Sequence, residues 1–222
     1  AVDIRKEEKN TIGSDYNIES TTHVHKAPDL IGIWGPSYFK SGVNKQYMKY
    51  VKKQTIAAIS TAVKNLVPVT LRIGQDLTGA IPFVVDSRDP QELDPGIRII
   101  QALDINTEET LGSLVSWSNH PETLWSKNLL ISSDFPHYFR YSIESGVFNA
   151  DTTLAKGIGG ISVFVNGAVG GLMTTNPSHP IPDPFNGKMH QGATYEKTQA
   201  QGQQLGLLAL NAIRSKEVVE IT

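Results

Sequence analysis

The hydrophobic pattern of the chain changes its period at Pro68, and this change limits the folds that are open to it. Between residues 45 and 66, apolar side chains recur every three or four positions, which is the spacing of an amphipathic helix. Directly after Pro68, Val69–Ile73 alternates in the manner of a half-buried strand. A helix followed so closely by a strand favours a fold that mixes both kinds of element.

The same succession of helix and strand patterns continues along the chain. Further strands are predicted at 16–22, 81–85, 97–103, 111–117, 161–165 and 218–221, and further helices at 136–144 and 194–213. No internal repeat of 20–50 residues accompanies them. The sequence therefore predicts an α/β fold for residues 1–222: a single domain with a mixed or mostly parallel β-sheet flanked by helices.

Composition excludes several classes of function. The chain has 20 Lys and Arg against 22 Asp and Glu, a formal net charge of −2, which argues against a nucleic-acid-binding protein. The longest apolar stretches have the length of strands, so no transmembrane helix is expected. The 222 residues include no cysteine, which excludes disulfides, thiolate nucleophiles and cysteine-based metal sites.

Two histidine motifs follow predicted strands. His23-Val24-His25 comes at the end of the first strand, where positions i and i+2 point to the same face. His120 follows the strand that ends at Trp117, and Pro121 restricts the backbone after it. If the two strands are parallel neighbours, His23 and His120 meet at one edge of the sheet, where imidazole nitrogens can bind zinc. The alternative is that all three are surface or loop histidines without a metal.

Two loops carry residues suited to binding a substrate. In the long loop 86–96, Arg88 lies between two aspartates, and it either grips a substrate oxygen or carboxylate or forms a local ion pair. The glycine-rich run 167–171 lacks the spacing of a phosphate-binding loop. Its glycines either allow tight turns or, at Gly170 and Gly171, present backbone N–H groups to substrate as an oxyanion hole.

Other histidines and hydroxyls give weaker signals. His179 and His190 lie in the proline-rich segment 176–192 and are either additional metal ligands or solvated side chains. No Gly-x-Ser-x-Gly motif marks a serine nucleophile, although composition alone leaves Ser-His-Asp catalysis open.

Four segments, taken in order, resemble the neutral/alkaline (non-lysosomal) ceramidase family. Residues 20–29 are similar to its Thr-His-Thr-His-Ser-Gly-Pro segment, and residues 115–124 to its strand ending in His-Pro-Thr-Ser. Residues 130–134 resemble its Leu-Ile-Ser-Ser-Asp segment, and residues 164–171 fall where the family has a strand and a Gly-Asp-Val-Ser-Pro-Asn loop. The order and spacing hold from about residue 15 to about residue 175.

The resemblance implies a zinc amidase domain that cleaves the N-acyl bond of ceramide-like lipids. In the family pattern, His23 and His120 would be zinc ligands, and His25 would contact the substrate or the developing oxyanion. Arg88 would match an arginine of the family's Asn-Arg-Ser loop. The expected partner is thus a lipid or other small-molecule substrate, and the expected location is secreted or periplasmic, with a cytoplasmic one left open. The oligomeric state is not indicated.

The chain departs from the family pattern at two points. Met173 stands where the family has its catalytic serine, so attack by a zinc-activated water is the simpler mechanism, with Thr174 or Thr175 as substitute nucleophiles. The family's remaining zinc ligands, a Glu and a Tyr, come from beyond the matched segment. We therefore expect a truncated part of a longer protein, or a relative that uses another carboxylate. The alternatives are a metallohydrolase of non-lipid esters or amides, and a non-catalytic domain with a degenerate site.

Overall fold

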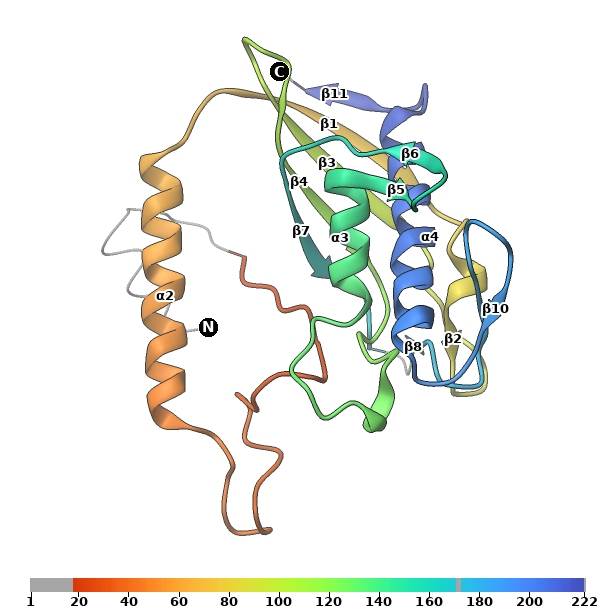
Figure 1. Cartoon of the computed structure of the whole chain (residues 1–222). Helices are drawn as coiled ribbons and strands as arrows, with labels where there is room; N and C mark the ends of the chain where they lie inside the picture. The colour runs from red at the N-terminus through yellow and green to blue at the C-terminus, as the bar shows by residue number, and fades with distance from the viewer. Residues whose placement is uncertain (1–17, 171–172, 222) are drawn as a thin grey trace. The chain divides into compact units, whose positions relative to one another are not determined.

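A computed structural model describes residues 18–170 and 173–221 (Figure 1). The chain divides into two compact units, Ala1–Ser20 with Ala27–Val67, and Thr21–Lys26 with Pro68–Thr222. The first unit contains helix α2 (Lys45–Lys64), which confirms the helix predicted from the apolar spacing. The Asn44 side chain caps this helix by accepting hydrogen bonds from the N–H groups of Gln46 and Tyr47. None of the described helices is long and apolar enough to span a membrane.

The second unit is built on a five-stranded sheet in the order β11-β1-β3-β4-β7. Its strands are β1 (Val69–Asp76), β3 (Ile97–Asp104), β4 (Thr110–Trp117), β7 (Ile161–Asn166) and β11 (Val219–Ile221). The pairs β11–β1, β1–β3 and β3–β4 are antiparallel, whereas β4 and β7 are parallel. The predicted α/β class is confirmed, and the sheet is mixed rather than mostly parallel.

Two helices, α3 (Phe135–Ser145) and α4 (Tyr195–Arg214), cover one face of this sheet (Figure 1). Helix α4 packs on β1 and β3, α3 packs on β7, and the helices pack on each other. Their approach is close because Gly202 and Gly206 face α3, where a Cβ would collide with Tyr138 and Ser142. The core between the layers is apolar and includes Ile97, Ile99, Val115, Trp117, Phe164, Phe135, Phe139, Ile143, Leu205 and Ala209.

Short elements make up the rest of the second unit. They are η1 (Ile81–Phe83), β2 (Val85–Asp86), η2 (Trp125–Lys127), β5 (Gly146–Phe148), β6 (Thr153–Lys156), β8 (Met173–Thr174), β9 (Ile181–Pro182) and β10 (Met189–His190). The strand predicted at 81–85 is wrong for its first part, because residues 81–83 form a 3₁₀ turn in which Pro82 has no N–H for a ladder. The strand predicted at 16–22 is not formed over residues 18–22, and residues 16 and 17 lie outside the described residues.

One edge of the sheet gathers the loops that carry several of the candidate residues named above. Because β4 and β7 are parallel and Trp117 pairs with Asn166, the loops that follow both strands leave at the same edge. Strand β8 lies beside β2, with Met173 opposite Asp86. The two motifs that follow Trp117 and Asn166 in the sequence are therefore neighbours in space.

Candidate metal centre

Three histidines converge at this carboxyl edge of β4 and β7. One ligand atom from each of His23, His25 and His120 lies within 4.8 Å of the others. The ring centroids are 4.7 Å apart for His23 and His120, 5.1 Å for His23 and His25, and 5.4 Å for His25 and His120. In the part of the chain that the structure describes, this is the one group of three or more such side chains that could hold a metal ion.

The segment that carries His23 and His25 reaches the site as irregular chain and not as the predicted strand. His23 has a φ of 58°, a left-handed conformation that non-glycine residues adopt uncommonly and that is found at functional sites. The Asn166 amide at the end of β7 donates to the carbonyl oxygens of Thr22 and Asn119, at 3.1 and 2.9 Å. The backbone N–H of His25 donates to Pro121 O at 3.4 Å. Asn166 thus links the two histidine segments.

His120 is held by the main chain of Met173. Its backbone N–H and its ring Nδ1 lie 3.1 and 2.6 Å from the Met173 carbonyl oxygen. A carbonyl oxygen can only accept, so Nδ1 carries the proton and Nε2 keeps the free lone pair. The sequence gives no sign of this contact, because every residue has a carbonyl group.

Glu122 is a site residue that the motif analysis did not assign. Its Oε2 lies 2.8 Å from His25 Nδ1, and its Oε1 accepts a 2.7 Å hydrogen bond from the Thr174 hydroxyl. Burial acts to raise the pKa of Glu122, but the hydrogen bonds from His25 and Thr174 outweigh it and the pKa is lowered. The available signal was its position two residues after His120, across Pro121.

The electrostatics of the cluster favour neutral imidazole at His23. Burial is the largest cause of its lowered pKa, followed by the neighbouring His120 and His25 and opposed by the Glu122 carboxylate. Neutral imidazole is the form that binds a metal. The cluster therefore suits a cation that the three rings share.

Thr174 and Thr175, whose hydroxyls were the predicted substitutes for a serine nucleophile, both form hydrogen bonds within the protein. Thr174 donates to Glu122. Thr175 Oγ1 accepts from the side-chain amides of Asn119 and Gln201 and donates to the carbonyl oxygen of Phe83. Both residues are buried, so neither hydroxyl is placed to attack a substrate.

Arg88 forms an ion pair at the start of its loop. Its Nε and Nη2 lie 3.3 and 3.2 Å from the two carboxylate oxygens of Asp86. Mainly through this side-chain hydrogen bond, the pKa of Asp86 is lowered to about 2. The Arg88 side chain is 44% exposed, so the guanidinium also has a face toward solvent. Gly170 is exposed, and Gly171 lies outside the described residues.

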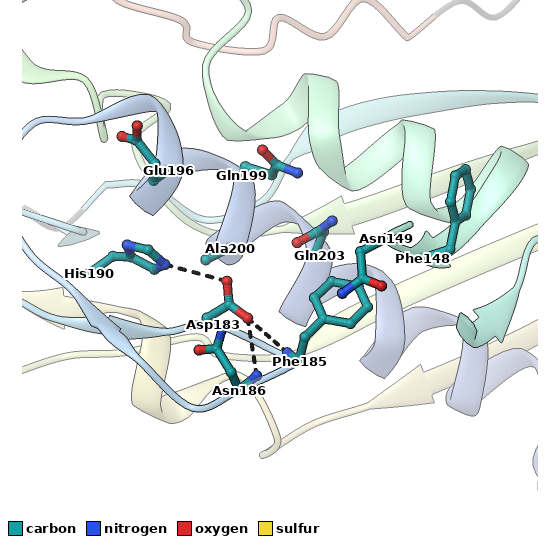
Figure 2. Close-up of a pocket in the computed structure, with 10 residues that line it drawn as sticks. All are labelled: Phe148, Asn149, Asp183, Phe185, Asn186, His190, Glu196, Gln199, Ala200 and Gln203. Atoms are coloured by element: carbon teal, nitrogen blue, oxygen red, sulfur yellow. Dashed lines mark hydrogen bonds and ion pairs between the residues drawn. The ribbon is translucent and has the colours of Figure 1, made fainter. Parts of the chain in front are cut away.

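A cavity of about 290 Å³ lies elsewhere, between α4 and the β9–β10 hairpin (Figure 2). His190, one of the possible additional ligands, lines it and pairs with Asp183 at 3.4 Å. His179, the other, lies 2.7 Å from the Pro82 carbonyl oxygen through Nε2. None of the three clustered histidines lines this cavity.

Solved structures match the chain, although no protein-family model and no curated protein does. The neutral ceramidase from Pseudomonas aeruginosa matches with a TM-score of 0.70 and 18% identity over 98% of this chain. The fold is ceramidase-like. A second structure, a ceramidase complexed with C2, matches with a TM-score of 0.68 and 18% identity, again over 98% of this chain. The chain spans about a third of those structures, 35% and 34% of their lengths.

Proposed function

We propose that this chain carries the metal-binding part of a ceramidase-like hydrolase that cleaves the N-acyl amide bond of ceramide-like lipids. The observation that carries the proposal is the cluster of His23, His25 and His120 at the carboxyl edge of a ceramidase-like fold. We also propose a secreted or periplasmic location, in line with the family resemblance.

The chemistry of the cluster fits zinc. It offers only imidazole nitrogens at its centre, and imidazole is a common zinc ligand. In His120 the Nδ1 proton is held by the Met173 carbonyl, which leaves Nε2 as the metal-binding atom. His23 and His120 are the two proposed ligands that the resemblance also implies.

A zinc ion held here would supply Lewis-acid polarisation of a carbonyl and activation of water. The chain's own residues would orient the substrate. The Asp86 carboxylate fixes the Arg88 guanidinium, whose remaining N–H groups can bind a substrate oxygen. The backbone around Gly170 and Gly171 is the proposed contact for the rest of the reacting amide. A water nucleophile agrees with the engagement of Thr174 and Thr175 in other hydrogen bonds.

His25 has two possible roles in this scheme. The resemblance assigns it to the substrate, where an imidazole can stabilise an oxyanion or move a proton. Its distance from the other two rings also allows it to bind the metal. Both roles require a free lone pair or proton at Nε2, because Nδ1 faces Glu122.

The test is elemental analysis of the purified protein, without added metal, followed by a substrate screen. Near one zinc per chain and release of fatty acid from N-acyl sphingoid substrates would support the proposal. If the protein contains zinc but hydrolyses only non-lipid esters or amides, the proposed lipid substrate is wrong and the metallohydrolase alternative holds. A protein with neither zinc nor turnover would sink the proposal and favour a degenerate binding domain.

A further inference from the structure

An ordered loop at residues 29–43 leads into helix α2 and is held in shape by its own hydrogen bonds (Figure 1). The Asp29 carboxylate accepts three backbone N–H groups from residues 31–34, at 2.8 to 3.0 Å. The two arms of the loop then meet, because the Gly42 N–H donates to the Trp34 carbonyl oxygen at 2.8 Å. The loop therefore presents its side chains from a fixed backbone, which lowers the entropic cost of binding a partner.

This loop exposes a group of large apolar side chains. Trp34 is 76% exposed, and Tyr38 and Phe39 are fully exposed. Ile31 and Ile33 are also mostly exposed. Isolated exposed hydrophobic residues are common on protein surfaces, but five within nine positions of one loop form a group of the kind that marks an interaction site. Apolar rings with a polar atom, such as those of Trp34 and Tyr38, are enriched where a membrane meets water.

A concentration of positive charge adjoins the exposed rings. Residues 27–67, which belong to the first unit, contain six lysines and one aspartate, a formal net charge of +5, whereas the whole chain carries −2. Lys40 lies in the loop, and Lys45, Lys49 and Lys53 follow at four-residue spacing along one side of α2. All four of these lysines are exposed. The segment thus joins an apolar loop to a basic helix face.

We propose that loop 29–43 and the adjoining lysines of α2 dock this protein on an anionic lipid surface. Trp34, Tyr38 and Phe39 enter the interfacial layer of the membrane, and the lysines face acidic headgroups. In peripheral anchors of this kind, the burial of apolar surface and the attraction to anionic lipids add together. The inference does not depend on the candidate metal centre, although an enzyme with a lipid substrate would meet such a surface.

Two other kinds of partner fit these residues less well. A protein partner would cover the exposed rings, but the cores of protein interfaces are depleted in lysine. A nucleic acid would pair with the lysines and stack on the rings, yet its interfaces are polar and offer little to the aliphatic chains of Ile31 and Ile33. An anionic bilayer accommodates aliphatic, aromatic and cationic side chains together.

The test is co-sedimentation of the purified protein with vesicles of equimolar phosphatidylcholine and phosphatidylglycerol, compared with vesicles of phosphatidylcholine alone. Wild-type protein is expected to bind the mixed vesicles more tightly, and high salt should weaken this preference. Lys45→Gln combined with Lys49→Gln should weaken binding about 25-fold, because each lysine near an anionic surface contributes about fivefold. Trp34→Ala combined with Phe39→Ala should weaken binding about tenfold or more through lost apolar burial.

Tryptophan fluorescence tests insertion of the loop separately from binding. The emission of Trp34 should shift to shorter wavelength on the mixed vesicles, because its ring leaves water, whereas Trp117 is already buried in the free protein. Trp34→Phe should keep most of the affinity and lose this shift. A shift of wild-type size in the Trp34→Phe protein would contradict insertion of the loop.

The matched controls lie in the second unit. Lys188→Gln combined with Lys216→Gln removes two exposed lysines, and Leu129→Ala combined with Ile131→Ala removes two exposed apolar side chains. Both are expected to keep wild-type affinity, and circular dichroism checks the fold of every variant. If wild-type protein fails to bind the mixed vesicles, or if the loop and lysine variants bind as tightly as the controls, the docking surface is overturned. Binding of a single-stranded oligonucleotide in place of the vesicles would assign the segment to nucleic acid instead. None of these outcomes measures zinc or turnover, so the proposed function is judged independently.

Discussion

The Nδ1 atom of His120 lies 2.6 Å from the carbonyl oxygen of Met173. Met173 therefore acts on the candidate centre through its backbone. Its side chain is buried in the core, and its sulfur accepts a 3.5 Å hydrogen bond from the Asp94 N–H. The Met173 carbonyl orients His120, whereas the Met173 side chain packs in the core. A substitution changes the side chain and keeps the carbonyl, so the two roles can be tested independently.

Met173→Ala is expected to destabilise the fold without removing the metal. Truncation of a buried methionine costs about 2–5 kcal/mol, depending on how far the cavity collapses. The carbonyl that holds His120 stays in place, so zinc stoichiometry should not change. Urea unfolding and elemental analysis of the folded variant check both parts. Met173→Leu, which preserves most of the volume, should cost less than about 1.5 kcal/mol. Loss of zinc from a folded Met173→Ala protein would contradict the separation.

His23→Ala and His120→Ala are each expected to abolish stoichiometric zinc. Each removes one imidazole from a centre with at most three in the described chain, and catalytic zinc normally needs three protein ligands. His137→Ala is the matched control, because His137 lies on α3 and contacts Tyr138 and Tyr141 instead of the cluster. Zinc per chain, measured by elemental mass spectrometry, should fall only in the first two. Full occupancy in both would remove the basis of the metal centre.

The sequence predicts that His23 and His120 meet at one edge of the sheet, and the structure brings them together by a partly different route. The rule that neighbouring parallel strands end together holds for β4 and β7, and it explains why the His120 loop and the glycine-rich loop meet. His23, however, arrives on irregular chain tied down by the Asn166 amide, which no periodicity reveals. Glu122 was visible beside His120 but had no pattern to distinguish it from a solvated carboxylate. The sequence could not predict the side-chain contacts between loops, such as Asn166 with Thr22 and Glu122 with His25.

Arg88→Ala is expected to lower turnover while the zinc content stays unchanged. Arg88 is proposed to orient substrate, and it contacts none of the three histidines. The effect should be seen in kcat/KM, with elemental analysis as the check on the metal. A variant as active as wild-type protein would rule out the role in substrate binding.

The same substitution should make the protein more sensitive to acid. The folded-state pKa of Asp86 is about 2, below its usual 3.8, so the ion pair adds stability above pH 3.8 that is lost as pH falls toward 2. Without Arg88 the folded pKa of Asp86 rises, and this contribution shrinks. The midpoint of acid unfolding, followed by tryptophan fluorescence, is therefore expected at higher pH in Arg88→Ala. An unchanged midpoint would show that the pair does not contribute.

Lys197 binds the chain directly after strand β8, the strand whose Met173 carbonyl contacts His120. Its ammonium is buried on α4 and donates to the carbonyl oxygens of Asn176 and Thr175, at 2.6 and 3.4 Å. Burial is the main cause of its pKa being lowered to about 8, and the attraction of Asp134 offsets this only in part. A charged lysine in this position stabilises the segment locally but carries a cost of desolvation.

This cost predicts a rise in stability with pH. The folded pKa lies below the usual 10.5, so between about pH 8 and 10.5 the unfolded chain binds a proton that the folded chain does not. The free energy of unfolding should therefore increase across that window through Lys197, by at most on the order of 3 kcal/mol. Lys197→Met should lack this increase, while the contributions of all other titrating groups cancel in the comparison. Urea unfolding of both proteins below and within the window measures the difference. Parallel stability curves for the two proteins would mean that Lys197 keeps its ordinary pKa in the folded state.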